Sequence, residues 1–233
     1  MLSVSIRGDI LVYSSAVRIR AKRILPRMNA DDTDQNLLCV LWGKCFGLGR
    51  IMKLALMVID MQKEFYVGQT KDQMDRATEH INYVIPMFEK KGLPIIWVQD
   101  KDEGEGVVPG KEGFEFIDSL KPKPDDIRIH KTYGNSFNKT DVDKILKEAG
   151  VDTVVMTGFC AEFCVLSTYR GAKDLDYFPV ILKNGIASTE EANKEFVEKI
   201  SETITCGVLV KLLADQPSIA TETTEKGEGL AAG

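Results

Sequence analysis

Between residues 52 and 213, short apolar runs alternate with stretches whose apolar residues recur every three or four positions. The runs lack the apolar–polar alternation of a strand with one exposed face, so we expect strands that are buried on both faces. We predict strands over residues 54–59, 94–99, 126–130, 152–157, 178–182 and 206–212. We predict helices over residues 72–91, 141–149, 164–175 and 190–203. Strands followed by helices indicate an α/β protein with a parallel sheet covered on both faces.

Glycine and proline positions support several of these boundaries. Gly92 and Gly150 each follow a predicted helix, where a left-handed residue commonly ends the helix. Pro86 lies inside the predicted helix 72–91 and should bend it. Residues 101–113 are charged and rich in glycine, which predicts an exposed loop.

The two ends of the chain differ from this pattern. Residues 1–51 hold eight Lys or Arg against four Asp or Glu; residues 11–24 are loosely amphipathic and basic, and residues 37–51 are apolar without a clear period. They could be an organelle-targeting segment, a docking arm, or an upstream extension that the fold does not use. We favour the extension, with Met52 as initiator, because the domain over residues 52–213 needs nothing before it, and we expect poor order through most of 1–51. Residues 214–233 are polar and predict a disordered tail.

Overall composition excludes several classes of protein. A net charge of −5 gives no sign of a nucleic-acid partner. Five cysteines without a CxxC pair argue against a disulfide framework or a zinc site, and they fit a reducing, cytoplasmic location. No apolar run approaches the roughly 18 residues of a membrane span.

A candidate nucleophile lies in the stretch over residues 154–164. An apolar, β-branched run breaks at Gly158, and helical spacing resumes after Cys164. This pattern predicts a buried strand, a tight turn and a helix with Cys164 near its N-terminus. Unpaired N–H groups and the partial positive charge of a helix N-terminus favour a thiolate. The alternative is that Cys164 is only a small buried apolar residue, as most free cysteines are.

Two charged residues end other predicted strands. Asp60 follows the first strand and Lys131 follows the third, while Cys164 lies just past the fourth. The carboxyl ends of parallel strands meet at one edge, so we expect these three side chains to lie together. The carboxylate could take the thiol proton, and the ammonium could lower the pKa of the thiol. Taken singly, Asp60 could cap a turn and Lys131 could be an ordinary solvated lysine.

Three motifs carry a resemblance to a known family. Residues 58–65 read Val-Ile-Asp-Met-Gln-Lys-Glu-Phe, residues 131–137 read Lys-Thr-Tyr-Gly-Asn-Ser-Phe, and residues 157–165 read Thr-Gly-Phe-Cys-Ala-Glu-Phe-Cys-Val. In order and spacing they resemble the signature segments of the isochorismatase-like cysteine hydrolase superfamily. The resemblance implies a three-layer α/β/α sandwich with a six-stranded parallel sheet.

The resemblance also implies roles for particular residues. It carries a catalytic triad onto Cys164, Asp60 and Lys131, and a cis peptide onto Phe159–Cys160. The backbone N–H groups of Cys160 and Cys164 would then form the oxyanion hole. The side chains that we take as candidate walls of the substrate site are Phe65, Gln99, Tyr133, Phe137 and Phe159. Small-molecule substrates and homo-oligomers are usual in this superfamily.

Departures from the family pattern narrow the expected activity. The nicotinamidase branch binds a metal through an Asp-x-His pair after the second strand and a further histidine, but residues 98–103 hold no histidine. His80 falls on a predicted helix, and His130 should point away from Lys131 by strand alternation. We therefore expect no metal and no other cofactor, which places the chain in the metal-independent amidohydrolase branch. Isochorismatases proper often carry glycine in place of the cysteine, so Cys164 favours amide hydrolysis.

The favoured hypothesis is a cysteine hydrolase that cleaves a C–N bond of a small amide, carbamoyl or ureido compound through a Cys164 thioester. One alternative is an isochorismatase-type hydrolase that cleaves a vinyl ether. The other is a non-catalytic binding protein with the same fold. The residues do not identify the substrate, because specificity depends on loops of about 5–15 residues.

Overall fold

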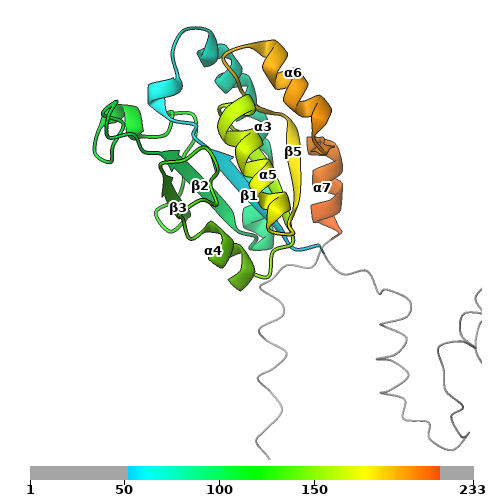
Figure 1. The fold of residues 1–233 in the computed structure, drawn as a ribbon. Helices are drawn as coiled ribbons and strands as arrows, with labels where there is room; N and C mark the ends of the chain where they lie inside the picture. The colour runs from blue at the N-terminus through cyan, green and yellow to red at the C-terminus, as the bar shows by residue number, and fades with distance from the viewer. Residues whose placement is uncertain (1–51, 216–233) are drawn as a thin grey trace, which may run out of the picture. The chain divides into compact units, whose positions relative to one another are not determined.

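The structure, a computed structural model, describes residues 52–215 (Figure 1). The predicted N-terminal extension and nearly all of the predicted tail lie outside the described residues. Six strands form one sheet in the order β3-β2-β1-β4-β5-β6. They are β1 Leu54–Ile59, β2 Ile95–Asp100, β3 Ile127–Lys131, β4 Thr153–Gly158, β5 Phe178–Ile186 and β6 Thr203–Ile204. Every neighbouring pair is parallel, which confirms the predicted sheet.

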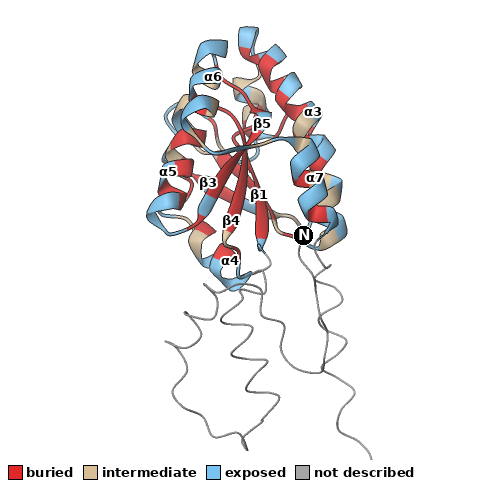
Figure 2. Cartoon of the chain, turned by 90° about the vertical axis from the view of Figure 1, so that its right-hand side faces the viewer, coloured by how far each residue is buried: buried red, intermediate tan, exposed pale blue. Residues whose placement is uncertain are grey.

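Helices cover both faces of this sheet (Figure 2). They are α3 Gly68–Lys91, α4 Val142–Glu148, α5 Leu166–Asp174, α6 Glu191–Ile200 and α7 Cys206–Ala214. Side chains of α3 and α7 pack into one hydrophobic cluster, and those of α4, α5 and α6 pack into another on the opposite face. The fold is therefore the expected three-layer α/β/α sandwich.

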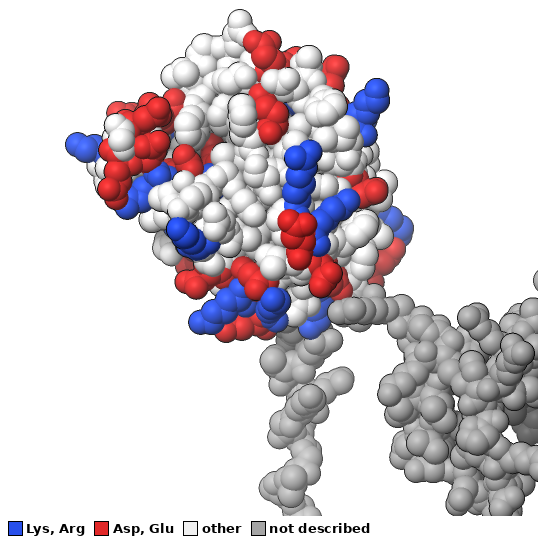
Figure 3. Space-filling model, viewed as in Figure 1, with Lys and Arg blue, Asp and Glu red and all other residues white. Residues whose placement is uncertain are grey.

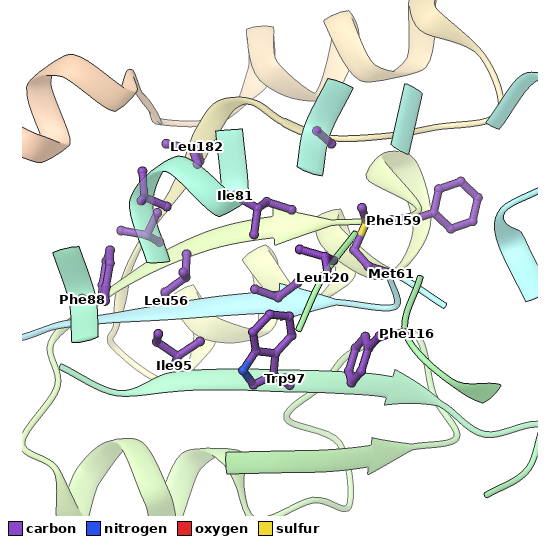
Figure 4. Close-up of a cluster of buried hydrophobic side chains, with 14 of the residues drawn as sticks. Leu56, Met61, Ile81, Phe88, Ile95, Trp97, Phe116, Leu120, Phe159 and Leu182 are labelled. Atoms are coloured by element: carbon purple, nitrogen blue, oxygen red, sulfur yellow. The ribbon is translucent and has the colours of Figure 1, made fainter. Parts of the chain in front are cut away.

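Strand β1 shows why the apolar runs read as buried strands. All six of its residues are buried, and alternate residues enter the two clusters. Burying each large aliphatic side chain stabilises the fold by about 1.5–3 kcal/mol. Figure 4 shows one cluster, in which the ring of Trp97 from β2 meets Phe116 edge-on at 5.3 Å between centroids.

Helix α3 follows the sequence pattern closely. It ends at Gly92, which adopts a left-handed φ of 66°, as its position after the helix predicts. Pro86 stays within the helix. The helix begins at Gly68, four residues before the expected start, because Thr70 accepts the backbone N–H of Val67 and satisfies one of the donors at this end.

The predicted strand over residues 206–212 is wrong, because this segment is helix α7. The Thr205 side chain accepts a hydrogen bond from the backbone N–H of Val208 at 3.4 Å and caps the helix. Leu209 and Leu213, four residues apart, share the buried face. The run is apolar enough for either element, and the cap and packing select the helix. The sixth strand is only Thr203–Ile204.

Acidic side chains gather over the segment that follows β2 (Figure 3). Exposed members of this group are Asp102, Glu103, Glu105, Glu112 and Glu115. The segment confirms the predicted exposed loop. It also contains the short 3-10 turn η2, Glu112–Phe114.

Candidate active site

The carboxyl ends of β1, β3 and β4 bring Asp60, Lys131 and Cys164 together. Lys131 Nζ lies 2.7 Å from Asp60 Oδ2 and 3.3 Å from Cys164 Sγ. The three residues are far apart in sequence, and only the parallel sheet places their side chains at one edge. The cluster has the groups that nucleophilic catalysis requires: a thiol, a carboxylate and an ammonium.

Asp60 is the first residue after β1 and is fully enclosed. Its backbone adopts a φ of 50°, and its N–H donates to Val98 O at 2.9 Å, so the main chain turns immediately after the strand. Neither carboxylate oxygen receives a hydrogen bond of good geometry from the described residues, although Lys131 makes an ion pair with Oδ2. Burial raises the pKa of Asp60 from 3.8 to about 6, against the opposing effect of Lys131. Such a carboxylate can accept and return a proton near neutral pH.

Strand alternation places Lys131 in the site. Along β3 the buried residues are Ile129 and Lys131, whereas His130 between them is exposed. The Lys131 side chain is buried and ion-paired, so its environment is unlike that of a surface lysine. Burial opposes its charge, but the attraction of Asp60 and the hydrogen bond to Asp100 outweigh burial and raise the pKa of Lys131. Lys131 therefore stays an ammonium throughout the useful pH range.

A second carboxylate, which the sequence reasoning missed, also contacts this lysine. Asp100 Oδ1 lies 2.8 Å from Lys131 Nζ. The side chain of Gln62 holds Asp100 by its backbone: Gln62 Nε2 donates to Asp100 O at 3.0 Å, and Asp100 N donates to Gln62 Oε1 at 2.7 Å. Asp100 ends β2, one residue beyond the predicted strand end. The rule that selected Asp60 and Lys131, a charged residue directly after a predicted strand, also selects Asp100 after residues 94–99, but it was not applied to the second strand.

Cys164 lies in a π-helical turn, η3 Ala161–Val165, that leads into α5. The peptide bond Phe159–Cys160 before this turn is cis, as the family resemblance implies. The carbonyl of Cys160 accepts the N–H groups of Phe163 and Val165, while no acceptor among the described residues binds the backbone N–H of Cys160. That N–H is available to a ligand.

The Cys164 thiol differs from the expected preformed thiolate. Burial and the neighbouring Asp60 raise the pKa of Cys164 to about 12, and Lys131 only partly offsets them. The expectation that a helix N-terminus and Lys131 would hold the pKa low is therefore wrong for the resting site. The sulfur keeps its proton at neutral pH, so a base must remove that proton during attack.

Glu162, also missed by the sequence reasoning, ties the turn to two other elements. Its carboxylate accepts hydrogen bonds from Ser188 Oγ and Asn193 Nδ2, each at 2.7 Å, and from Cys160 Sγ at 3.0 Å. Burial works against its charge, yet the hydrogen bonds from Cys160 and Ser188 hold the pKa of Glu162 below its usual range. Burial and Glu162 raise the pKa of Cys160 to about 12, which suits a backbone role for Cys160.

The predicted wall residues have different surroundings. Phe65 and Phe159 stack at 5.4 Å between centroids, and Tyr133 is exposed beside Lys139. Two others make contacts that support the fold. Gln99 Nε2 donates to the backbone of the η2 turn, and Phe137 stacks on the ring of Tyr177. The role of all five as walls of a substrate site stays a prediction.

Residues 52–215 contain no group of three or more His, Cys, Asp or Glu side chains that could hold a metal ion. His80 lies on α3, and His130 packs edge-on against the ring of Phe114. None of the helices in this part of the chain is long and apolar enough to span a bilayer.

The fold and the cluster together define an α/β sandwich with a Cys–Asp–Lys site at the carboxyl edge of its sheet. The chain belongs to the isochorismatase family, because the family's isochorismatase domain matches residues 54–206. This result confirms the resemblance inferred from the three motifs.

Three relatives are informative, one found by its sequence and two by their solved structures. Ureidoacrylate amidohydrolase RutB of Caulobacter vibrioides is 35% identical over 112 residues, which are 48% of either chain. The chain thus matches only about half the length of that relative. N-carbamoylsarcosine amidase of Thermoplasma acidophilum is 28% identical with a TM-score of 0.60, over 66% of this chain and 97% of the amidase. An isochorismatase-like hydrolase of Alkaliphilus metalliredigens is 27% identical with a TM-score of 0.62, over 68% and 98%.

Proposed function

We propose that this protein is a cysteine hydrolase that cleaves the C–N bond of a small carbamoyl or ureido compound through a thioester on Cys164. The observation that carries the proposal is the contact of Lys131 Nζ with both Asp60 Oδ2 and Cys164 Sγ. The names of two relatives, an amidohydrolase of ureidoacrylate and an amidase of N-carbamoylsarcosine, favour this substrate class over other amides.

In the first half of the reaction, Asp60 takes the proton of the Cys164 thiol as the sulfur attacks the substrate carbonyl. The backbone N–H of Cys160, which has no acceptor among the described residues, and that of Cys164 would stabilise the oxyanion of the tetrahedral intermediate. Asp60 then gives its proton to the departing nitrogen. The C–N bond breaks, the amine or ammonia leaves, and the acyl group remains on sulfur as a thioester.

In the second half, water replaces the amine. Asp60, again ionised, removes a proton from the water as its oxygen attacks the thioester carbonyl. The C–S bond breaks, and the proton on Asp60 returns to the Cys164 sulfur. The sum is addition of one water across the C–N bond. Lys131 carries its positive charge throughout and stabilises both the thiolate and the ionised Asp60.

The test is ammonia release from a panel of small ureido, carbamoyl and simple amide compounds. We expect turnover by the wild type and a loss of at least about 10³-fold in Cys164→Ala. Cys206→Ala, which removes a thiol on α7, is the matched control and should keep full activity. Mass spectrometry of the quenched reaction should detect an acyl adduct on the peptide that contains Cys164. Equal ammonia release by wild type and Cys164→Ala would defeat the proposal.

The same assay, extended to vinyl ethers, to binding measurements and to alkylation of Cys164, separates the two alternatives. Turnover of vinyl ethers but not of amides would identify an isochorismatase-type hydrolase. Saturable binding of panel compounds without turnover, together with no reaction of Cys164 with iodoacetamide, would identify a binding protein. The expected homo-oligomer and cytoplasmic location stay predictions, and sedimentation of the full chain would test the first.

A further inference from the structure

The proposed reaction uses one carboxylate, but Lys131 lies between two. Its Nζ is 2.7 Å from Asp60 Oδ2 and 2.8 Å from Asp100 Oδ1, so these two oxygens are at most about 5.5 Å apart, the sum of the two contacts. The carboxylates differ in exposure: the side chain of Asp60 is 1% exposed and that of Asp100 is 27% exposed. One ammonium therefore serves an enclosed carboxylate and a second one that is open to solvent.

Asp100 is held in place independently of Lys131. Gln62, which is fully buried, hydrogen-bonds both backbone polar groups of Asp100 and also donates to Phe114 O at 3.1 Å. On the neighbouring strand, Lys131 O accepts the N–H of Lys101 at 2.7 Å, which ties the end of β3 to the residue after Asp100. A carboxylate fixed by the main chain in this way can fix the flexible lysine side chain.

We propose that Asp100 is a positioning residue that anchors the Lys131 ammonium and, by its negative charge, keeps Asp60 basic enough to accept the thiol proton. The proposal rests on the proposed function, since Asp60 is the base of that reaction. An ammonium paired with Asp60 alone would stabilise the carboxylate so strongly that the carboxylate would be a poor base. A second carboxylate on the same nitrogen opposes that stabilisation.

The charged and titratable groups that act on Asp60 come from three elements. They are Lys131 from β3, Asp100 from β2 and Cys164 from η3. Lys131 and Cys164 lower the pKa of Asp60, whereas burial and Asp100 raise it. Loss of the Asp100 charge should therefore shift the titration of Asp60 toward acid. A unit charge about 5 Å away at an effective dielectric constant of about 20 is worth about 2.4 pKa units, and solvent on Asp100 reduces that to about one.

Alkylation of Cys164 tests the effect of Asp100 on Asp60 without any substrate. The full chain is treated with iodoacetamide between about pH 4 and pH 9, and the rate is followed on the peptide that contains Cys164. The wild-type rate should rise through about pH 6, where Asp60 becomes able to take the thiol proton. In Asp100→Asn, which keeps an oxygen for Lys131 but loses the charge, this rise should move about one pH unit toward acid. In Asp100→Ala the rise should also move, and the plateau rate should fall because Lys131 loses its anchor.

The control is Glu103→Gln, which removes one negative charge from the loop that follows Asp100, from a side chain paired with Lys101. Its profile should match the wild type. Thermal melts of all variants establish whether they fold. If Asp100→Asn does not fold, Asp100→Ala is used in its place. A rise that stays within about 0.2 pH unit of wild type in Asp100→Asn, or that moves equally in Glu103→Gln, would overturn the proposal.

The outcome is distinguishable from failure of the proposed function. An unshifted profile in a protein that hydrolyses ureido compounds removes only the role of Asp100. A shifted profile in a protein that turns over none of the panel supports the link between Asp100 and Asp60 and rejects the substrate assignment.

Discussion

Replacing Lys131 with methionine should destabilise the protein more at pH 8 than at pH 5. The change keeps a long unbranched side chain in a fully buried position but removes the charge that compensates Asp60. A carboxylate left buried without a cation either stays ionised at high cost or takes a proton. Protonating Asp60 costs little free energy at pH 5 and more at pH 8, where the proton concentration is a thousandfold lower.

The size of the effect follows from the pKa of Asp60. In the wild type this pKa is raised from 3.8 to about 6, so ionising Asp60 opposes folding increasingly between these pH values and no further above pH 6. Loss of Lys131 removes the main effect that lowers the pKa. If Asp60 then titrates above pH 8, two more pH units at about 1.4 kcal/mol each add roughly 3 kcal/mol of destabilisation.

The assay is urea unfolding of wild type and Lys131→Met at both pH values. Any loss of packing is common to both pH values and cancels in the comparison. Lys144→Met, at an exposed position on α4, should show no such pH dependence. The double variant Asp60→Asn, Lys131→Met should also lack this pH dependence, because no ionisable group remains at position 60. Equal destabilisation of Lys131→Met at pH 5 and pH 8 would refute the coupling of the two charges.

Three further predictions concern the turn and the reaction. Gly158→Ala should lower the thermal midpoint by more than 5 °C or prevent folding, because the glycine has a φ of 119° and a Cβ there would overlap the Ile59 carbonyl. The control Gly207→Ala places its Cβ in open space, so the midpoint should stay unchanged or rise. Glu162→Ala should reduce turnover about tenfold or more, because it removes the hydrogen bonds that hold the η3 turn. Glu162→Gln keeps one acceptor oxygen and should lose less turnover. Equal losses in the two variants would argue that these hydrogen bonds do not hold the turn for catalysis. Turnover by the wild type should rise with pH through about 6 as Asp60 ionises, and a flat profile from pH 5 to pH 8 would exclude Asp60 as the base.

Local chemistry in the sequence was sufficient for much of the fold. Apolar runs predicted strands β1, β2, β4 and β5, while β3 is a strand in which apolar and polar residues alternate. The succession of strands and helices predicted the parallel pairing, and Gly92 marked the end of α3. The same kind of signal failed over residues 206–212, because an apolar run without a clear period suits a buried strand and a buried helix equally. Capping by Thr205 and packing of the resulting helix on α3 decided that case.

For the site, the sequence by itself determined which residue types end the strands, and a parallel sheet then requires Asp60, Lys131 and Cys164 to share an edge. What only the tertiary structure decided was the balance of charge around them. The partnership of Asp100 with Lys131, and the burial that keeps Cys164 protonated, depend on distances and solvent access among residues from different strands. Proton affinities respond to every neighbouring charge through space, and a sequence pattern specifies neighbours only along the chain.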